Sequence, residues 1–128
     1  MTEILHKELS DSILKVFYEV YNELGYGFIE KVYQNAMYLE LKSQGFKVEA
    51  QKQIKVHYKD ELVGDFFADL LIDDLIILEL KACDVLVKAH YVQTLNYLKA
   101  TNIEIGLLLN FVEKPEIKRL IFTNNRKN

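Results

Sequence analysis

The chain has 128 residues, of which half are apolar and 27% are charged, and its formal net charge is −3. This composition excludes a disordered protein, and a chain of this length buries roughly two thirds of its surface on folding. We therefore expect one domain over residues 1–128.

The sequence also bears on where the protein is located and what it binds. The single cysteine, Cys83, cannot form an internal disulfide, which favours the cytoplasm. No apolar run is long enough to span a membrane, so no membrane contact is expected. The negative charge argues mildly against bulk coating of nucleic acid but leaves room for a local basic surface.

Two amphipathic helices are predicted at the start of the chain. From about residue 3 to 24, apolar residues recur at steps of three and four, and Gly25 and Gly27 end the pattern. The same periodicity returns from about residue 28 to 44 and stops at Gly45, the residue expected at a helix C-terminus. Both helices precede the first strand.

The pattern then changes to alternation, which predicts strands at 46–58, 62–72 and 75–82 with tight connections at Lys59-Asp60 and Asp73-Asp74. These three strands are expected to form an antiparallel meander. A third helix is predicted over 87–101. The strand that follows, 103–111, is apolar on both faces and therefore belongs in the middle of a sheet. An edge strand at 118–123 and a frayed end from Asn124 complete the pattern. The predicted class is α/β, a mixed sheet flanked by helices in the order α, α, β, β, β, α, β.

Two carboxylates and a lysine stand out in the second and third predicted strands. Glu79 and Lys81 point to one face because strand side chains alternate, and Asp69 lies in the preceding strand. A two-residue turn at Asp73-Asp74 would pair Asp69 with Leu78 and put Glu79 on the opposite face. A three-residue loop or a bulge would pair Asp69 with Glu79. The sequence leaves both registers open.

Two converging carboxylates repel each other unless one is protonated or a cation lies between them. Asp69, Glu79 and the main-chain carbonyl of Leu80 are the oxygen donors that Mg²⁺ or Mn²⁺ accepts, and Lys81 could orient a metal-bound water or stabilise charge on a phosphate. This set of groups is suited to metal-dependent hydrolysis of phosphodiesters. The alternative is a solvated ion pair at a strand end.

The residues together resemble a known family. Asp69 with Glu79-Leu80-Lys81, in this order of elements, resembles the PD-(D/E)XK nuclease superfamily, with Ala68 where proline is frequent. Gly27, Glu30 and Tyr33 match the motif of the GxxExxY family within it, and Gln93 and Tyr97 resemble the QxxxY helix motif of RecB-like nucleases. The resemblance extends from the first helix to Phe111.

The resemblance implies a role for each of these residues. Asp69 and Glu79 would hold the metal, Glu30 would assist directly or through water, and Lys81 would be the catalytic lysine. Gln93 would orient the lysine, the water or the phosphate, and the register that pairs Asp69 with Glu79 is favoured. Tyr33 and Tyr97 could contact substrate, although aromatic residues at such positions more often use their hydroxyls structurally. Asp65 is a reserve ligand if its strand is unbulged.

The charges are distributed unevenly along the chain. Residues 42–59 contain five lysines and one acid, whereas residues 60–84 contain eight acids and one lysine. A second basic cluster lies at the end of the sequence. Basic rims around an acidic centre would let nucleic acid, in the first place DNA, approach with little sequence specificity; exposed strand faces explain the lysines equally well. We expect a metal-dependent nuclease-like domain, which could form a homodimer. The alternative is a non-catalytic nucleic-acid or protein interaction module on the same fold.

Overall fold

The computed structural model describes residues 5–127, and its elements follow the predicted order. None of the helices in this range is long and apolar enough to cross a membrane. The helices are α1 (Lys7–Leu24), α2 (Glu30–Ser43) and α3 (Lys88–Lys99), with a short 3₁₀ turn, η1 (Asn124–Arg126). The strands are β1 (Val48–Tyr58), β2 (Glu61–Ile72), β3 (Ile76–Lys81), β4 (Ile105–Asn110) and β5 (Glu116–Ile121).

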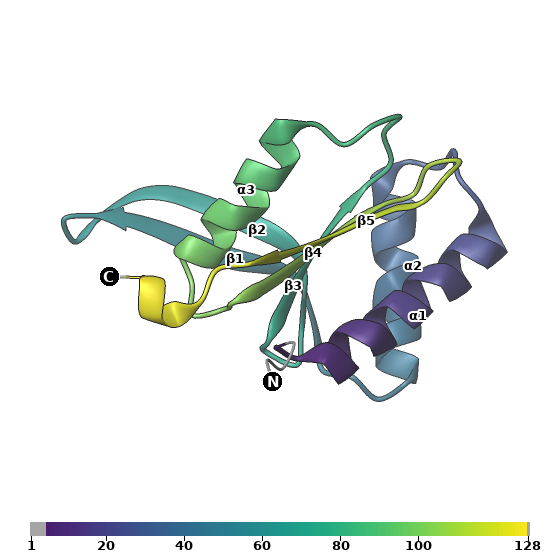
Figure 1. The fold of residues 1–128 in the computed structure, drawn as a ribbon, viewed down its shortest axis with the longest axis horizontal. Coiled ribbons are helices and arrows are strands. Elements are labelled where there is room, and N and C mark those ends of the chain that lie inside the picture. Colours follow the sequence, from purple (N-terminus) through teal and green to yellow (C-terminus); the bar gives the residue numbers. More distant parts are fainter. Residues whose placement is uncertain (1–4, 128) are drawn as a thin grey trace.

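The five strands form one mixed sheet in the order β1-β2-β3-β4-β5. Neighbouring strands are antiparallel except β3 and β4, which run parallel because α3 carries the chain back between them (Figure 1). Every residue of β4 is buried, as its apolar sequence predicts for a strand covered on both faces. The α/β class with a mixed, helix-flanked sheet is thereby confirmed.

The helices cover the two faces of this sheet. Alternation in β3 sends Leu78 and Leu80 into the core under α1 and α2, whereas Ile77 packs in a second core with Tyr97 and Leu98 of α3. Glu79 and Lys81 have the same parity as Ile77, so they belong to the α3 face. The end of α2 is fixed by bonds from Gly45 N–H to Lys42 O and from Phe46 N–H to Leu41 O, the paired bonds of a Schellman motif.

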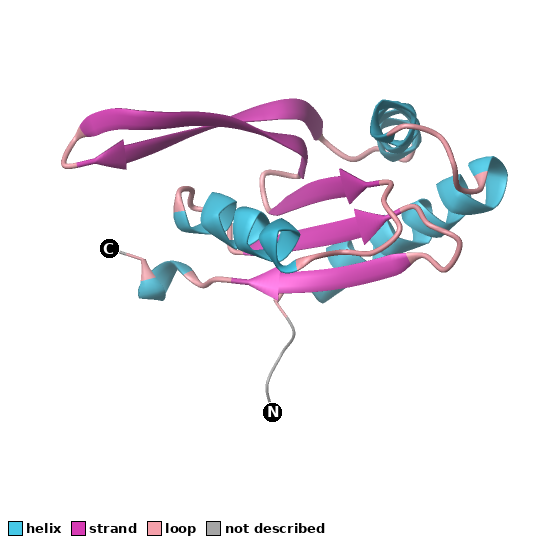
Figure 2. Ribbon diagram, turned by 90° about the horizontal axis from the view of Figure 1, so that it is seen from above, coloured by secondary structure: helices cyan, strands magenta, loops and turns pink. Residues whose placement is uncertain are grey.

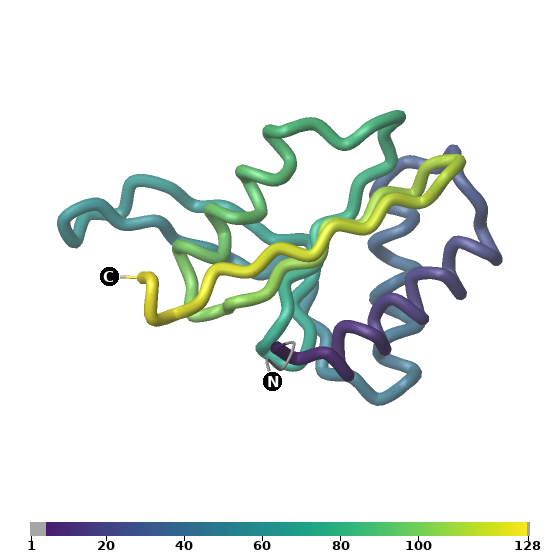
Figure 3. Tube along the Cα trace, viewed as in Figure 1, coloured from purple at the N-terminus to yellow at the C-terminus, as the bar shows by residue number. Residues whose placement is uncertain are grey.

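The β1–β2 hairpin bends away from the sheet halfway along its length. Gln51 adopts a left-handed conformation (φ 54°) and interrupts the β1–β2 ladder opposite Asp69. Ala68 and Leu71 both pack in the α3 core although strict alternation would put them on opposite faces. The strands therefore swap faces at this kink. Beyond it they continue as a two-stranded arm that reaches away from α1 and α2 (Figures 2 and 3).

The C-terminal residues are ordered rather than frayed. Asn124 N–H donates to the Glu104 carboxylate, and the Lys127 ammonium donates to the carbonyls of Thr101 and Ile103. These polar contacts with the turn before β4 hold the tail. A polar tail without apolar periodicity carries no sequence signal for such docking, so the expectation of fraying over 124–128 was wrong for residues 124–127, and Asn128 lies outside the described residues.

Candidate metal and phosphodiester site

The connection between β2 and β3 settles the register that the sequence leaves open. Asp73 and Asp74, both in left-handed conformations, form a tight turn closed by a bond from Leu75 N–H to Ile72 O (2.9 Å). Leu75 is nevertheless an extra residue, because Ile72 pairs with Ile76 in the ladder. The loop is therefore three residues long. This register places Asp69 opposite Glu79 on the α3 face.

The two carboxylates meet at the point where β2 and β3 separate. The ladder between these strands ends at the pair Leu70 and Leu78. One step further, Asp69 N–H donates to Glu79 Oε2 (2.8 Å) and Leu80 N–H donates to Asp69 Oδ2 (2.7 Å). Each side chain thus accepts a backbone hydrogen bond from the other strand. These two bonds take over from the missing ladder bonds and fix both carboxylates side by side.

Burial makes this pair unfavourable when both groups are charged. Glu79 is only 4% exposed. Burial, followed by repulsion from Asp69, raises the pKa of Glu79 to about 8, against the opposing effects of the Asp69 N–H and the Lys81 charge. Burial also raises the pKa of Asp69, which the hydrogen bond from Leu80 opposes. A proton or a cation is needed to relieve this arrangement.

The donor set fits a hard divalent cation. Asp69 and Glu79 supply one carboxylate each. The carbonyl of Leu80 points to the same strand edge as its N–H, toward β2, because both groups of a strand residue project to one side. Mg²⁺ is bound in proteins by one or two carboxylates, with water or substrate phosphates in the remaining positions. Residues 5–127 contain no group of three or more His, Cys, Asp or Glu side chains arranged for a metal. Any metal here would therefore keep several non-protein ligands.

The start of α2 brings a third acid near this pair. Glu30 is exposed, and its charge contributes to the raised pKa of both Asp69 and Glu79. Among the described residues, Glu30 does not complete a three-ligand group with Asp69 and Glu79.

Gly27 and Tyr33 shape the loop that positions Glu30. Gly27 has φ 109°, a conformation that side-chain-bearing residues rarely adopt. The Tyr33 hydroxyl donates to Gly25 O (2.8 Å) and accepts from Phe28 N–H (3.2 Å), and its ring stacks on Phe111. Tyr33 is fully buried. A buried ring whose hydroxyl already serves the loop is not placed to contact a substrate, so its role here is structural.

Helix α3 adds a hydrogen-bonded pair on the same face of the sheet. Gln93 Nε2 donates to the Tyr97 hydroxyl (3.1 Å). Tyr97 is 6% exposed and packs in the α3 core with Ala68, which precedes Asp69, and with Ile77 of β3. Its pKa is raised by burial and then by the charges of Glu79 and Asp69. Gln93 is exposed, so its amide oxygen is open to an incoming group.

Two expectations about charged residues need correction. Asp65 lies beyond the kink, is exposed and accepts hydrogen bonds from Gln53, so it is not on the Asp69 face and is no reserve ligand. The lysines between 42 and 59 do not form one basic rim, because Lys47 pairs with Asp74 (2.6 Å) and Lys52 with Glu49 (3.4 Å). The kink at Gln51 causes the first error, and a polar residue in an alternating strand gives no sign of it.

Strands that separate around a buried and a half-buried carboxylate, with a lysine on the same face, define a nuclease-like α/β protein. The model of the PD-(D/E)XK nuclease superfamily matches residues 7–120. The chain belongs to this superfamily, whose members generally use divalent metal ions and whose activity is hydrolysis of phosphodiesters in nucleic acid.

Comparison with solved structures agrees at the level of the fold. The crystal structure of SSO0001 superposes with a TM-score of 0.54 at 17% sequence identity, over 73% of this chain and 52% of that one. The chain therefore spans about half the length of that protein. No curated protein sequence matches the chain.

Proposed function

We propose that this protein is a Mg²⁺- or Mn²⁺-dependent nuclease that hydrolyses phosphodiester bonds in nucleic acid, DNA in the first place, with little sequence specificity. The observation that carries the proposal is the reciprocal bonding of Asp69 and Glu79 across the point where β2 and β3 separate. A purely structural role would favour an apolar pair here, because placing two carboxylates side by side, one buried and one half-buried, costs stability unless a proton or a cation offsets the charge.

Each residue of the site has a task in this mechanism. Asp69, Glu79 and the Leu80 carbonyl would hold the cation, which when bound supplies a Lewis acid and an activated water. Lys81, on the same face, stabilises charge that develops on the phosphate or orients the water. Gln93 and the Tyr97 hydroxyl position the phosphate from α3, and Glu30 accepts a hydrogen bond from water at the edge of the site.

We also propose that the chain belongs to the GxxExxY group. The positions of the three motif residues support this proposal. Gly27 and Tyr33 shape the loop before α2, and Glu30 is near enough to Asp69 and Glu79 for its charge to contribute to their raised pKa values. The QxxxY spacing joins Gln93 to Tyr97, as in the RecB-like motif. We further propose that residues 1–128 form a single domain, that the protein is located in the cytoplasm and that it assembles as a homodimer.

The deciding experiment is incubation of the purified protein with Mg²⁺ or Mn²⁺ and labelled single- and double-stranded DNA and RNA. Asp69→Asn retains an acceptor for Leu80 N–H and removes the charge, and Lys81→Ala removes the lysine. Asp65→Asn is the matched acidic control, because it lies in the same strand and is exposed. We expect a 10²- to 10⁴-fold loss of cleavage for the first two variants, on the order found when one charged catalytic group is removed, and no loss for the control.

Cleavage that survives both Asp69→Asn and Lys81→Ala would eliminate this site. Inactivity of the wild-type protein on every substrate would favour the non-catalytic interaction module instead.

A further inference from the structure

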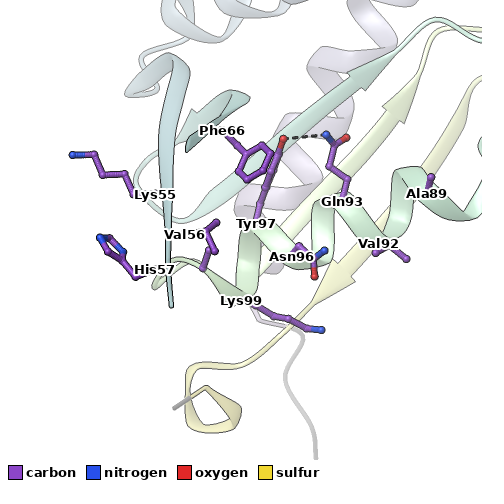
Figure 4. Close-up of a pocket in the computed structure, with 11 residues that line it drawn as sticks. Lys55, Val56, His57, Phe66, Ala89, Val92, Gln93, Asn96, Tyr97 and Lys99 are labelled. Atoms are coloured by element: carbon purple, nitrogen blue, oxygen red, sulfur yellow. Dashed lines mark hydrogen bonds between the residues drawn. The ribbon is translucent and has the colours of Figure 1, made fainter. Parts of the chain in front are cut away.

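A groove separates the β1–β2 arm from α3 beside the proposed site. Its volume is about 720 Å³, which is within the range of pockets that hold small ligands. Figure 4 shows Phe66 of the arm next to Tyr97 of α3, with the Gln93–Tyr97 hydrogen bond above them. The Phe66 and Tyr97 ring centroids are 6.1 Å apart. The groove therefore begins at Tyr97, the α3 residue that packs with Ala68 and Ile77 next to the proposed site.

Phe66 is an exposed aromatic residue at the groove. It is 45% exposed, although Tyr97 contacts one side of it. The separation of the two rings is too small for another ring to enter between them, so a planar group would stack on the free side of Phe66. Gly64 allows this position, because a Cβ at residue 64 would lie 2.8 Å from the Phe66 ring.

The polar groups around this ring are suited to a nucleotide. The exposed amide of Asn96 can hydrogen-bond a base edge. None of the described residues that line the groove is acidic, and Lys99, Lys55 and His57 stand at its rim. Figure 4 shows Lys55 and His57 pointing away from α3, so Lys99 is the lining cation that lies on the helix side of the groove. The groove thus combines an aromatic ring and an amide with positive charge and no acid among its described lining residues, which suits a nucleotide.

We propose that this groove holds an unpaired nucleotide stacked on Phe66, so that single-stranded nucleic acid is the preferred substrate. A base in a duplex is stacked on both faces by its neighbours and offers none to a side chain, whereas an unpaired base does. This inference rests on the proposed nuclease function, since the groove adjoins the same carboxylates.

The test measures binding in the Asp69→Asn background, so that cleavage does not interfere. Fluorescence anisotropy is recorded with labelled DNA and RNA oligonucleotides of about 12 nucleotides, each as a single strand and as a duplex. Phe66→Ala removes the stacking surface, and Phe66→Trp restores it. Phe67→Ala is the matched control, because Phe67 is the adjacent residue, 49% exposed, and alternation directs it to the other face of the arm.

We expect Phe66→Ala to weaken single-strand binding by about 5- to 100-fold, the range for loss of one stacked base. Phe66→Trp should bind at least as well as phenylalanine, Phe67→Ala should change affinity less than twofold, and duplex affinity should not respond to Phe66. Equal losses for Phe66→Ala and Phe67→Ala, an equal loss on duplex, or no single-strand binding would overturn the inference.

The two proposals fail separately in this design. If the wild-type protein cleaves in an Asp69-dependent manner while Phe66→Ala behaves like Phe67→Ala, the groove assignment is wrong and the nuclease remains. If single strands bind in a Phe66-dependent manner but nothing is cleaved, the groove remains and the catalytic proposal is wrong.

Discussion

Asp69 and Glu79 are held together by the place where the β2–β3 ladder ends. Where β2 and β3 separate, two backbone N–H groups lose their ladder partners, and the two carboxylates accept them instead. Buried donors of this kind must be satisfied. The same bonds that complete the sheet therefore hold two acids together in a setting that disfavours their charges.

The first prediction concerns the pH dependence of stability. The pKa of Glu79 is about 8 in the folded protein and about 4.5 when unperturbed, so between these values the unfolded chain binds fewer protons than the folded one. The free energy of unfolding, measured in EDTA by urea denaturation, should therefore fall as pH rises from 5 to 8, by on the order of 3 kcal/mol. Glu79→Gln keeps the acceptor for Asp69 N–H and should flatten the curve.

At pH 8 the Glu79→Gln variant should accordingly be more stable than the wild-type protein. Asp65→Asn, at an exposed acid, should leave the curve unchanged. A wild-type curve that matches that of Glu79→Gln would show that Glu79 is not the titrating group.

At the scale of elements, the position of α3 against β4 decides whether Gln93 and Tyr97 reach the carboxylates. The helix packs tightly on the strand at Gly106, where a Cβ would lie 2.8 Å from Thr94 Cγ2. Thr94 is fully buried and β-branched, so it has little freedom to move. Gly106 thus sets the distance between the helix and the sheet.

The second prediction compares two glycines with the same close distance. Gly106→Ala should destabilise the protein by about 1–3 kcal/mol, the usual cost of overpacking a core, and should lower activity by displacing α3. Gly64→Ala also meets a side chain at 2.8 Å, but the half-exposed Phe66 ring can rotate away. Its unfolding free energy should change by less than about 1 kcal/mol. Thermal or urea unfolding checks both, and equal losses would contradict this account of the packing.

Sequence patterns predicted the elements well because their signals are local. The end of α2 follows from Gly45, and the burial of β4 follows from its unbroken apolar run. The β2–β3 register could not be decided, because Asp73-Asp74 forms the same tight turn whether Leu75 is paired or extra. The kink at Gln51 was missed because glutamine has no preference for a left-handed conformation, and only the tertiary structure imposes it.

For the whole molecule, the acids between residues 60 and 84 fall into two groups with different surroundings. Asp73 and Asp74 bind the start of β1, through Lys47 N–H and the Lys47 ammonium. Asp69 and Glu79 remain without an ion pair among the described residues. The negative charge that counts against nucleic-acid binding in the composition is therefore partly neutralised within the fold and partly concentrated at one point.

The third prediction follows from that unneutralised pair. A divalent cation that binds only the folded protein stabilises it, by about 2.7 kcal/mol at a concentration about 100 times its Kd. Mg²⁺ or Mn²⁺ should therefore raise the Tm, and more at pH 8 than at pH 6, because the carboxylates must lose protons to bind. Scanning calorimetry in each cation measures this without any substrate. An equal rise in Asp69→Asn would place the cation elsewhere.

The three-residue loop between β2 and β3 also constrains how this protein can diverge. Asp69 and Glu79 face each other across a regular hairpin and are ten residues apart in the chain. Adding one residue to each strand between them and the loop changes this interval by two, so in a regular hairpin the interval changes only in even steps. Deletion of one residue from the loop would leave the sequence of β3 unchanged but would shift its pairing with β2 by one residue. Glu79 would then point to the opposite face of the sheet. Homologues with an odd interval must therefore carry a compensating bulge, and the parity of this interval is a criterion for recognising distant members that share the geometry.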